Sequence, residues 1–247
     1  MEKCVAIIMP AYNCRDTLSR AVESVINQTY KNWHLYIIND ASPEPLDDIL
    51  SFYENKHENI TVINNSENQG AAGSRNIGLR HSDEEVIAFL DSDDFWHPTK
   101  LQKQIAILGD SGGVITSYFF ISEENEKKSI KISGVFLFLN DLLKKKYKIC
   151  FSSLIHYRIP GLYFEKIGHE DFLYIYNLFK RFDRLSILDE YLVDCYYLTT
   201  SLSANKKKAA CWHFNVLKKI FPGRYDKIIY YFIFYAINGF LFRIRNK

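Results

Sequence analysis

Val86-Ile87-Ala88-Phe89-Leu90-Asp91-Ser92-Asp93-Asp94 is the stretch that decides the fold of this chain of 247 residues. Its five consecutive apolar residues predict a strand buried on both faces, as the strands of parallel sheets are. A dense acidic loop follows directly. Because ligands of open α/β sheets bind outside the carboxyl ends of the strands, we expect a functional site at this loop.

Short apolar strands alternate with helical periodicity on both sides of this stretch. This alternation predicts an α/β protein with a Rossmann-like, mostly parallel central sheet flanked by helices. The predicted strands are Val5–Met9, Trp33–Ile38 and Ile60–Ile63, and the predicted helices are Leu18–Ile26, Leu46–Tyr53, Ala71–Arg80 and one that starts at Pro98.

The pattern changes after residue 110. Two β-rich segments separated by a charged turn, Val114–Ile121 and Ile130–Phe138, predict antiparallel additions to the sheet. A short helix over Asp141–Lys146, a strand over Ile149–Tyr157 and a helix over Glu170–Arg181 are expected next. Without repeats or low-complexity linkers, residues 1–110 and 111–205 are expected to be two parts of one folding unit.

Net charge distinguishes residues 1–205, the body of the chain, from residues 206–247, its C-terminal tail. The whole chain has a formal net charge of +2, but residues 206–247 carry ten basic residues and one acidic residue, which leaves −7 for residues 1–205. Eleven of the 38 aromatic residues lie in the same tail. Basic and aromatic residues together favour an anionic membrane surface over a solvated tail.

Helical spacing in the tail supports this interpretation. Lys206–Ile220 carries apolar residues at helical intervals, and Ile228–Phe242 is apolar except for Asn238 and Gly239. These 15 residues are fewer than the roughly 20 that cross a bilayer, so we expect a helical tail that lies on the membrane. The alternative is a tail that packs on the catalytic body or forms a dimer contact.

The cysteines and the N-terminus bear on location. Five cysteines without a CxxC pair argue against a disulfide framework and a zinc site and predict reduced thiols. The first apolar run is five residues long and ends at Pro10, so no secretory signal is expected. The body is predicted to be cytoplasmic, and no nucleic-acid partner is expected.

Four groups of residues can carry chemistry. Asp91, Asp93 and Asp94 repel one another, and Mg²⁺ or Mn²⁺ would relieve that repulsion, although an acidic turn that caps a helix is the alternative. Asp40 ends the second strand, where it binds a ligand or forms an Asx-turn or a helix cap. The glycine-rich helix start at 70–78 offers N–H groups and a guanidinium to an anion, or packs closely against the sheet. Glu170-Asp171 either does chemistry or lies favourably at a helix N-terminus.

The order of these motifs along the chain resembles that of the family 2 glycosyltransferases, especially the bacterial enzymes that assemble O-antigen or capsule repeats. The resemblance covers residues 4–110 well and extends more loosely to residue 205. It rests on Pro10-Ala11-Tyr12-Asn13, Asn39-Asp40-Ala41-Ser42, Asn68-Gln69-Gly70 with Arg75-Asn76, Phe89-Leu90-Asp91-Ser92-Asp93-Asp94 with Trp96, Ser152-Ser153, Glu170-Asp171-Phe172 and Ser201-Leu202-Ser203.

This resemblance implies a GT-A fold and transfer of a sugar, with inversion, from a nucleotide diphosphate donor that is usually UDP-linked to an acceptor hydroxyl. It implies that residues 1–110 bind the nucleotide sugar and residues 111–205 the acceptor, and it implies roles for individual residues. On the donor side, Pro10, Ala11 and Tyr12 line the nucleotide pocket, Asp40 bonds to the uracil, and Arg75, Asp91 and Ser92 lie near the donor. Asp93 ligates Mn²⁺ or Mg²⁺, Asp171 is the general base, and Glu170 and His169 lie on the acceptor side.

The expected acceptor is a glycan on a polyprenyl diphosphate, which would bring the enzyme to the cytoplasmic face of the inner membrane. Two other functions remain open. A sugar nucleotidyltransferase also uses acidic metal ligands, but no glycine-rich segment with a basic residue follows the first strand here. An inactive nucleotide-sugar-binding partner is the third possibility, against which the intact Asp93 and Asp171 argue.

Overall fold

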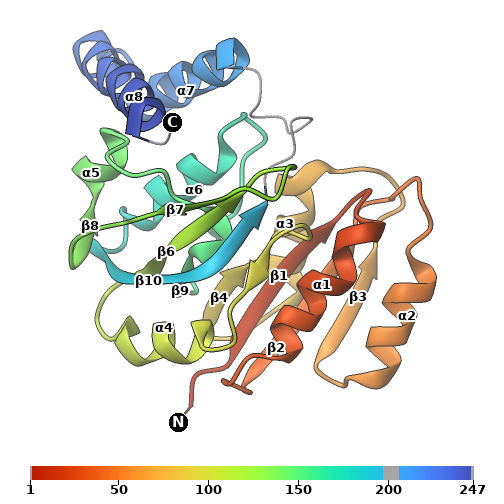
Figure 1. Cartoon of the computed structure of the whole chain (residues 1–247). Coiled ribbons are helices and arrows are strands. Elements are labelled where there is room, and N and C mark those ends of the chain that lie inside the picture. Colours follow the sequence, from red (N-terminus) through yellow and green to blue (C-terminus); the bar gives the residue numbers. More distant parts are fainter. Residues whose placement is uncertain (1, 197–205, 246–247) are drawn as a thin grey trace.

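The computed structural model describes residues 2–196 and 206–245, and its strands form one central sheet (Figure 1). The strands are β1 Val5–Ala11, β2 Trp33–Asn39, β3 Ile60–Asn64, β4 Val86–Phe89, β5 Phe95–Trp96, β6 Gly113–Ile121, β7 Lys127–Ile130, β8 Phe136–Phe138, β9 Ile155–Tyr157 and β10 Arg184–Tyr196. The helices are α1 Arg15–Ile26, α2 Asp47–Lys56, α3 Gly70–His81, α4 Lys100–Leu108, α5 Leu139–Leu143, α6 Glu170–Leu178, α7 Lys206–Ile220 and α8 Tyr225–Arg245, with a 3-10 turn at Phe151–Ser153.

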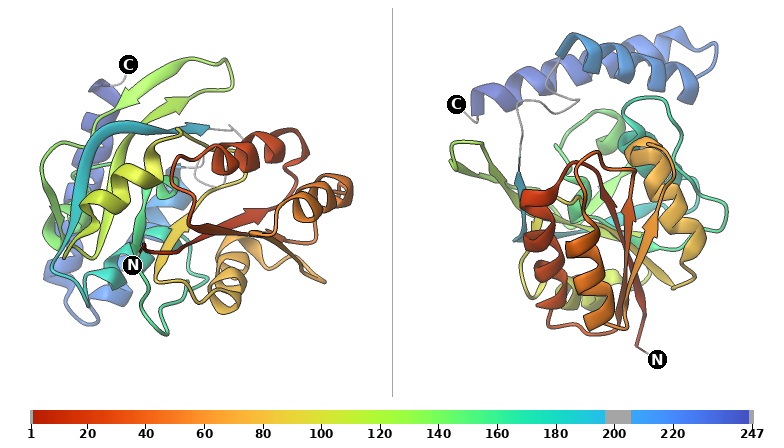
Figure 2. Two further views of the ribbon diagram at one scale, coloured as in Figure 1. Left: turned by 90° about the horizontal axis from the view of Figure 1, so that it is seen from below. Right: turned by 90° about the vertical axis from the view of Figure 1, so that its right-hand side faces the viewer.

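The first half of the sheet is parallel, as predicted. Its strand order is β3-β2-β1-β4-β9-β6-β10-β5, with β7 on β6 and β8 on β10. β1 pairs in parallel with β2 and β4, and β2 pairs in parallel with β3. Figure 2 shows α3 on the opposite face of these strands from α1. The carboxyl ends of β1, β2 and β4 therefore meet at one edge, between two helical layers.

Close packing of α3 on the sheet explains one glycine of its sequence. A Cβ at Gly78 would lie 2.6 Å from Ile8 Cγ2 and 3.0 Å from Ile38 Cδ1, both fully buried side chains of β1 and β2. The helix approaches the sheet this closely only because residue 78 has no side chain. Close packing, the alternative considered for the glycine-rich segment, is therefore present here.

Three predictions beyond residue 110 are wrong in their bounds. Ile130–Phe138 is not one strand, because Gly134 has φ +117° and separates β7 from β8. The predicted strand at Ile149–Tyr157 is reduced to β9, because the 3-10 turn buries Phe151 against Phe89. The helix expected at Asp141–Lys146 is α5, which begins earlier and ends at Leu143 because the chain turns to φ 50° at Lys145.

The sequence analysis missed the longest strand, β10. It pairs in parallel with β6 and antiparallel with β8 and β5. Register shifts interrupt its pairing with β6 between Leu188 and Tyr191 and again before Asp194. Irregular pairing of this kind breaks the strict two-residue alternation by which a strand is recognised in a sequence.

The C-terminal helices form a hairpin over α5 and α6. Figures 1 and 2 show it at the end of the molecule toward which β1 points. Val216, Leu217 and Ile228 of the hairpin belong to the same buried apolar cluster as the sheet. The tail thus packs on the body, and none of the described helices has both the length and the hydropathy that a membrane crossing requires.

Candidate active site

Arg75 joins two predicted site residues that lie 96 and 16 positions from it. Its Nη1 donates to Asp171 Oδ1 at 2.7 Å and its Nη2 donates to Asp91 Oδ1 at 2.6 Å. The guanidinium carbon lies 4.8 Å from the Phe151 ring centroid and 5.4 Å from that of Phe164. With only 3% of its surface exposed, Arg75 is held rigidly between the end of β4 and the start of α6.

The electrostatics of this bridge affect Asp171. The surrounding protein removes water from the carboxylate and raises its pKa to about 6; Arg75 opposes this shift, while the charges of Asp91 and Glu170 add to it. Burial also disfavours the charged form of Arg75, but Asp171 and Asp91 outweigh burial and raise its pKa. Asp171 is 45% exposed in its side chain, so an incoming group can still reach it.

The acidic loop after β4 is held in place by its neighbours. The Asp91 N–H donates to Ser152 Oγ at 3.1 Å, and the Asp93 carbonyl accepts from Arg20 Nη2 at 2.6 Å. Burial and then the charge of Asp91 raise the pKa of Asp93 to about 6. Asp91 and Asp93 are both half-buried, and their carboxylates form a set of hard oxygen donors that fits a divalent cation. Ser92 lies between them and is also half-buried.

Asp94 differs from its two acidic neighbours because it points into the protein. It is 3% exposed, and its oxygens accept from Ser152 Oγ at 2.5 Å and from the Tyr196 N–H at 2.9 Å. Cys150 and Cys195, which are 45 positions apart, meet it there, with the ligand atoms of all three within 4.8 Å of one another. Within the described parts of the chain this is the one group of three possible metal-binding side chains. Asp94 is engaged in fixing β10 and the Ser152 turn.

Asp40 caps α3. Its Oδ1 accepts from the Gln69 N–H at 2.8 Å and from Asn65 Nδ2 at 2.7 Å, and its Oδ2 accepts from the Gly70 N–H at 2.8 Å. The carboxylate is 2% exposed and compensates N–H groups that the first turn of a helix leaves unpaired. The helix cap considered as an alternative is therefore present, and the contact of Asp40 with uracil stays a prediction.

The end of β1 places the other predicted nucleotide residues beside Asp40. The Asp40 N–H donates to the Ala11 carbonyl at 2.9 Å, so the two strand ends lie together. Pro10 is half-buried and Ala11 is buried, whereas Tyr12 has half of its surface exposed. Asn13 follows with φ 49°, and its N–H donates to Ser42 Oγ at 2.8 Å. The Tyr12 ring therefore lies at the surface of this edge.

The predicted acceptor side is in contact with the C-terminal hairpin. His169 precedes α6 with φ 51°, and its ring centroid lies 5.6 Å from that of His213 on α7. Burial and the charge of Lys145 lower the pKa of His169 to about 4, so the ring is neutral at pH 7. A Cβ at Gly168 would lie 2.5 Å from the Trp212 side chain. Sequence reasoning missed this contact and the nearby Lys145, because no motif marks either of them.

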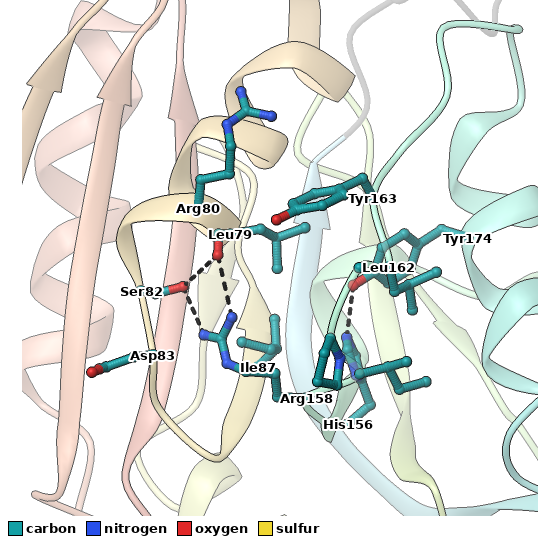
Figure 3. Close-up of a pocket in the computed structure, with 13 residues that line it drawn as sticks. Leu79, Arg80, Ser82, Asp83, Ile87, His156, Arg158, Leu162, Tyr163 and Tyr174 are labelled. Atoms are coloured by element: carbon teal, nitrogen blue, oxygen red, sulfur yellow. Dashed lines mark hydrogen bonds between the residues drawn. The ribbon is translucent and has the colours of Figure 1, made fainter.

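A cavity of about 340 Å³ lies elsewhere, between the end of α3 and residues 158–163 (Figure 3). None of the predicted site residues lines it. Arg158 in its wall donates to the carbonyls of Glu84 and Leu79 and to Ser82 Oγ, while Tyr174 OH lies 3.2 Å from His156 Nε2. The Arg158 bonds hold the segment before β4, and the contact between Tyr174 and His156 joins α6 to β9.

The sheet is of the type that binds nucleotides, and acidic groups gather at its strand ends. This arrangement is typical of group-transfer enzymes, and a family match identifies which group of them the chain belongs to. Residues 6–164 match the model of glycosyl transferase family 2. The chain belongs to this family of glycosyltransferases. It is 36% identical over 254 residues, 98% of each chain, to UDP-Glc:alpha-D-GlcNAc-diphosphoundecaprenol beta-1,3-glucosyltransferase WfaP of Escherichia coli. Family membership does not favour the nucleotidyltransferase or the inactive partner.

Solved structures confirm the predicted GT-A fold. TarS of S. aureus, in complex with UDP-GlcNAc, superposes with a TM-score of 0.73 at 16% identity and covers 90% of this chain and 67% of its own. Mannosyltransferase PcManGT of Pyrobaculum calidifontis, in complex with GDP-Man and Mn²⁺, gives a TM-score of 0.61 at 16% identity, with 89% and 62% covered. At these identities the likeness concerns the fold.

Proposed function

We propose that the protein transfers a sugar from a UDP-linked donor, with inversion, to a hydroxyl of a glycan carried on a polyprenyl diphosphate in bacterial surface polysaccharide synthesis. The observation that carries the proposal is the Arg75 bridge, which holds Asp91 and Asp171 together at the carboxyl edge of the parallel strands. The relative WfaP also supports the proposal. Its name states a donor and an acceptor of this chemistry, and its similarity extends over 98% of this chain.

Asp171 is the proposed general base. It takes the proton from the acceptor hydroxyl while that oxygen attacks the anomeric carbon, and the bond from this carbon to the diphosphate oxygen breaks. General base catalysis of this kind contributes roughly a hundred- to ten-thousand-fold. A pKa near 6 keeps most of the carboxylate ionised at neutral pH yet basic enough to accept a proton. A single displacement needs no enzyme nucleophile, so an α-linked donor gives a β-linked product.

The donor lies on the other side of the Arg75 bridge in this proposal. Tyr12 offers an exposed ring to the flat base, next to Pro10 and Ala11, and Asp40 fixes the helix start beside it. Asp91 and Ser92 face the ribose or the transferred sugar. Because Arg75 contacts Asp91 as well as Asp171, it fixes the distance between the donor and the base.

Asp93 is the proposed ligand of Mg²⁺ or Mn²⁺, with Asp91 beside it. The raised pKa of Asp93 reflects the burial and mutual repulsion that a cation would relieve, so the donor set fits the ion. A bound divalent cation supplies positive charge to the diphosphate as the leaving group departs. Transfer should be lost on chelation and recover with added manganese; transfer that persists at full rate after chelation would exclude this role.

Glu170 and His169 are proposed to lie against the acceptor. His169 is neutral and has a buried Nδ1 without a partner among the described residues. Glu170 adds negative charge beside Asp171 and so raises the pKa of the proposed base. Both residues lie at the start of α6, on the side of Asp171 that faces the hairpin.

The membrane is the proposed docking surface of α8. This helix is apolar on both sides: one side packs on the body, and the other exposes a contiguous apolar face. Lys207, Lys218 and Lys227 are exposed on the same hairpin and would attract anionic lipids at the cytoplasmic face of the inner membrane. The exposed apolar residues are Tyr225, Ile229, Tyr230, Ile233, Ile237, Phe240 and Leu241.

Vesicle binding tests this part of the proposal. The protein should sediment with phosphatidylglycerol vesicles, and Ile233→Glu with Ile237→Glu should abolish that binding. Phe52→Glu is the matched control, because Phe52 is 55% exposed on the distant α2. Equal sedimentation of the α8 variant and the wild-type protein would exclude α8 as the docking face.

Product analysis tests the reaction itself. UDP-sugars are incubated with a panel of sugars carried on lipid diphosphates, and the released nucleotide is identified. We expect UDP and an extended glycan. Release of pyrophosphate in a parallel incubation with UTP and a sugar 1-phosphate would mean nucleotidyl transfer. The absence of both transfer and donor hydrolysis across the panel would favour a binding protein without activity.

A further inference from the structure

Two lysines lie between the catalytic body and α8. They are Lys145, which follows α5 and is half-buried, and Lys148, which is exposed, and we call them the lysine pair. Their ε-amino groups lie 4.7 to 5.9 Å from the centroids of four aromatic rings, two from the catalytic body and two from α8. These rings are Phe172 and Tyr235 around Lys145, and Phe120 and Phe242 around Lys148.

Neither member of the pair has a carboxylate partner among the residues that the structure describes. Lys146, which lies between them in sequence, instead pairs with Asp141 at 3.3 Å. Burial and the charge of Lys148 lower the pKa of Lys145 to about 8, and burial lowers the pKa of Lys148. Two neighbouring cations repel each other, and an anion bound between them would relieve the repulsion.

Two histidines provide an independent sign of an anion site. His213 is fully buried, and among the described residues neither of its ring nitrogens has a hydrogen-bond partner; the buried His169 Nδ1 also lacks one. The His213 ring packs against Phe172 and Tyr235, the two rings that also flank Lys145, and its centroid lies 5.6 Å from that of His169. Each neutral ring carries one N–H donor. Lys145 and the two histidine rings thus place several N–H donors close together.

We propose that the lysine pair binds the diphosphate of the acceptor, an inference that rests on the function proposed above. Such an acceptor consists of a sugar, a diphosphate and an apolar chain, in that order. Lys145 lies between Phe172, which follows Asp171 on α6, and Tyr235 of α8, so the protein presents Asp171, Lys145 and α8 in the same order. The donor diphosphate lies on the other side of Arg75, beside Asp91 and Asp93, so these lysines serve the acceptor.

The test compares one acceptor sugar on two carriers, decyl diphosphate and neutral decanol. The wild-type enzyme should have a much lower KM for the diphosphate acceptor. Lys145→Met and Lys148→Met should each raise that KM on the order of tenfold, since a charge-assisted contact is lost. The KM for the neutral acceptor, the KM for the UDP-sugar and kcat should change little. Lys146→Met, which removes an equal charge outside the lysine pair, is the matched control.

A binding measurement without turnover separates this inference from the proposed function. Decyl diphosphate is titrated into the wild-type protein and the three variants by calorimetry, and phosphatidylglycerol vesicles form a second arm. If no UDP-sugar is turned over but Lys145→Met weakens binding of decyl diphosphate, the function fails and the anion site stands. Equal wild-type KM values for both carriers would overturn the inference while the function holds. Loss of vesicle binding alone would assign the lysines to lipid headgroups and also overturn it.

Discussion

Arg75 is the residue on which the site depends. A lysine in its place has one compact charge and could not reach both carboxylates with the fixed fork of a guanidinium. Its two aromatic neighbours and its near-complete burial leave it a single position. Arg75 therefore fixes the positions of Asp91 and Asp171 relative to each other.

Asp171→Asn should abolish transfer, with a loss of about a hundred- to ten-thousand-fold in kcat, while calorimetry finds UDP binding unchanged. A base acts in its deprotonated form, and the pKa of Asp171 is raised to about 6. Turnover of the wild-type enzyme should therefore fall as the pH drops through 6, by about tenfold per unit below it. Asp183→Asn, at an exposed position, is the control. A flat pH profile from 5 to 8 would argue against Asp171 as the base.

At the residue scale, the sequence predicted which residues belong to the site but not the contacts among them. Asp91 and Asp171 attracted attention because each follows or begins a recognisable element, and the family resemblance implied their roles. Their common partner Arg75 could be expected only near the donor, because the path of the chain between residues 97 and 170 decides where α6 starts. The lysine pair carried no signal at all, since a run of lysines in a sequence is usually a solvated surface.

At the scale of elements, parallel strands were predicted well and later strands poorly. β1 and β4 are uninterrupted apolar runs, and β2 is apolar from Leu35 to Ile38, because helices cover both faces of that part of the sheet. β10 mixes Asp189, Glu190 and Asp194 with apolar residues, because its pairing with β6 shifts register twice. A pattern that depends on pairing partners cannot be read from one strand alone.

Two glycines in helices should respond oppositely to alanine. Gly78→Ala should destabilise the protein by about 1–3 kcal/mol, because the new Cβ would overlap Ile8 and Ile38 in a packed core. Gly239→Ala should stabilise it by up to about 1 kcal/mol, because no atom lies within 4 Å of that position in α8 and alanine favours a helix. Urea denaturation measures both. Equal effects of the two substitutions would contradict the close packing of α3 on the sheet.

At the scale of the whole molecule, the hairpin is part of the catalytic body. Asn238 Nδ2 donates to the Lys144 carbonyl at 2.7 Å, and Lys219 pairs with Glu165. His213 is enclosed by Phe172 and Tyr235, with ring centroids at 4.9 and 4.2 Å. The tail and the body differ in net charge, which suggested two separate structural units. They nevertheless share one apolar core.

Leu217→Ala should lower the stability of the whole protein by about 2–5 kcal/mol, because Leu217 is fully buried in the cluster that includes the sheet. Circular dichroism during urea denaturation should give one transition, shifted to lower urea. An early transition of the hairpin, followed by a body that unfolds at its original midpoint, would contradict a common core.

The packing of His213 and Asn238 has a further consequence, because a hairpin mounted rigidly on the body fixes the height of Asp171 above any surface on which α8 rests. An enzyme on a flexible tether would reach acceptors at many heights. This enzyme should therefore be selective for glycan length and should prefer the acceptor whose hydroxyl lies at the height of Asp171. On vesicles, acceptors with one, two and three sugars should differ sharply in rate, and in detergent solution that preference should weaken.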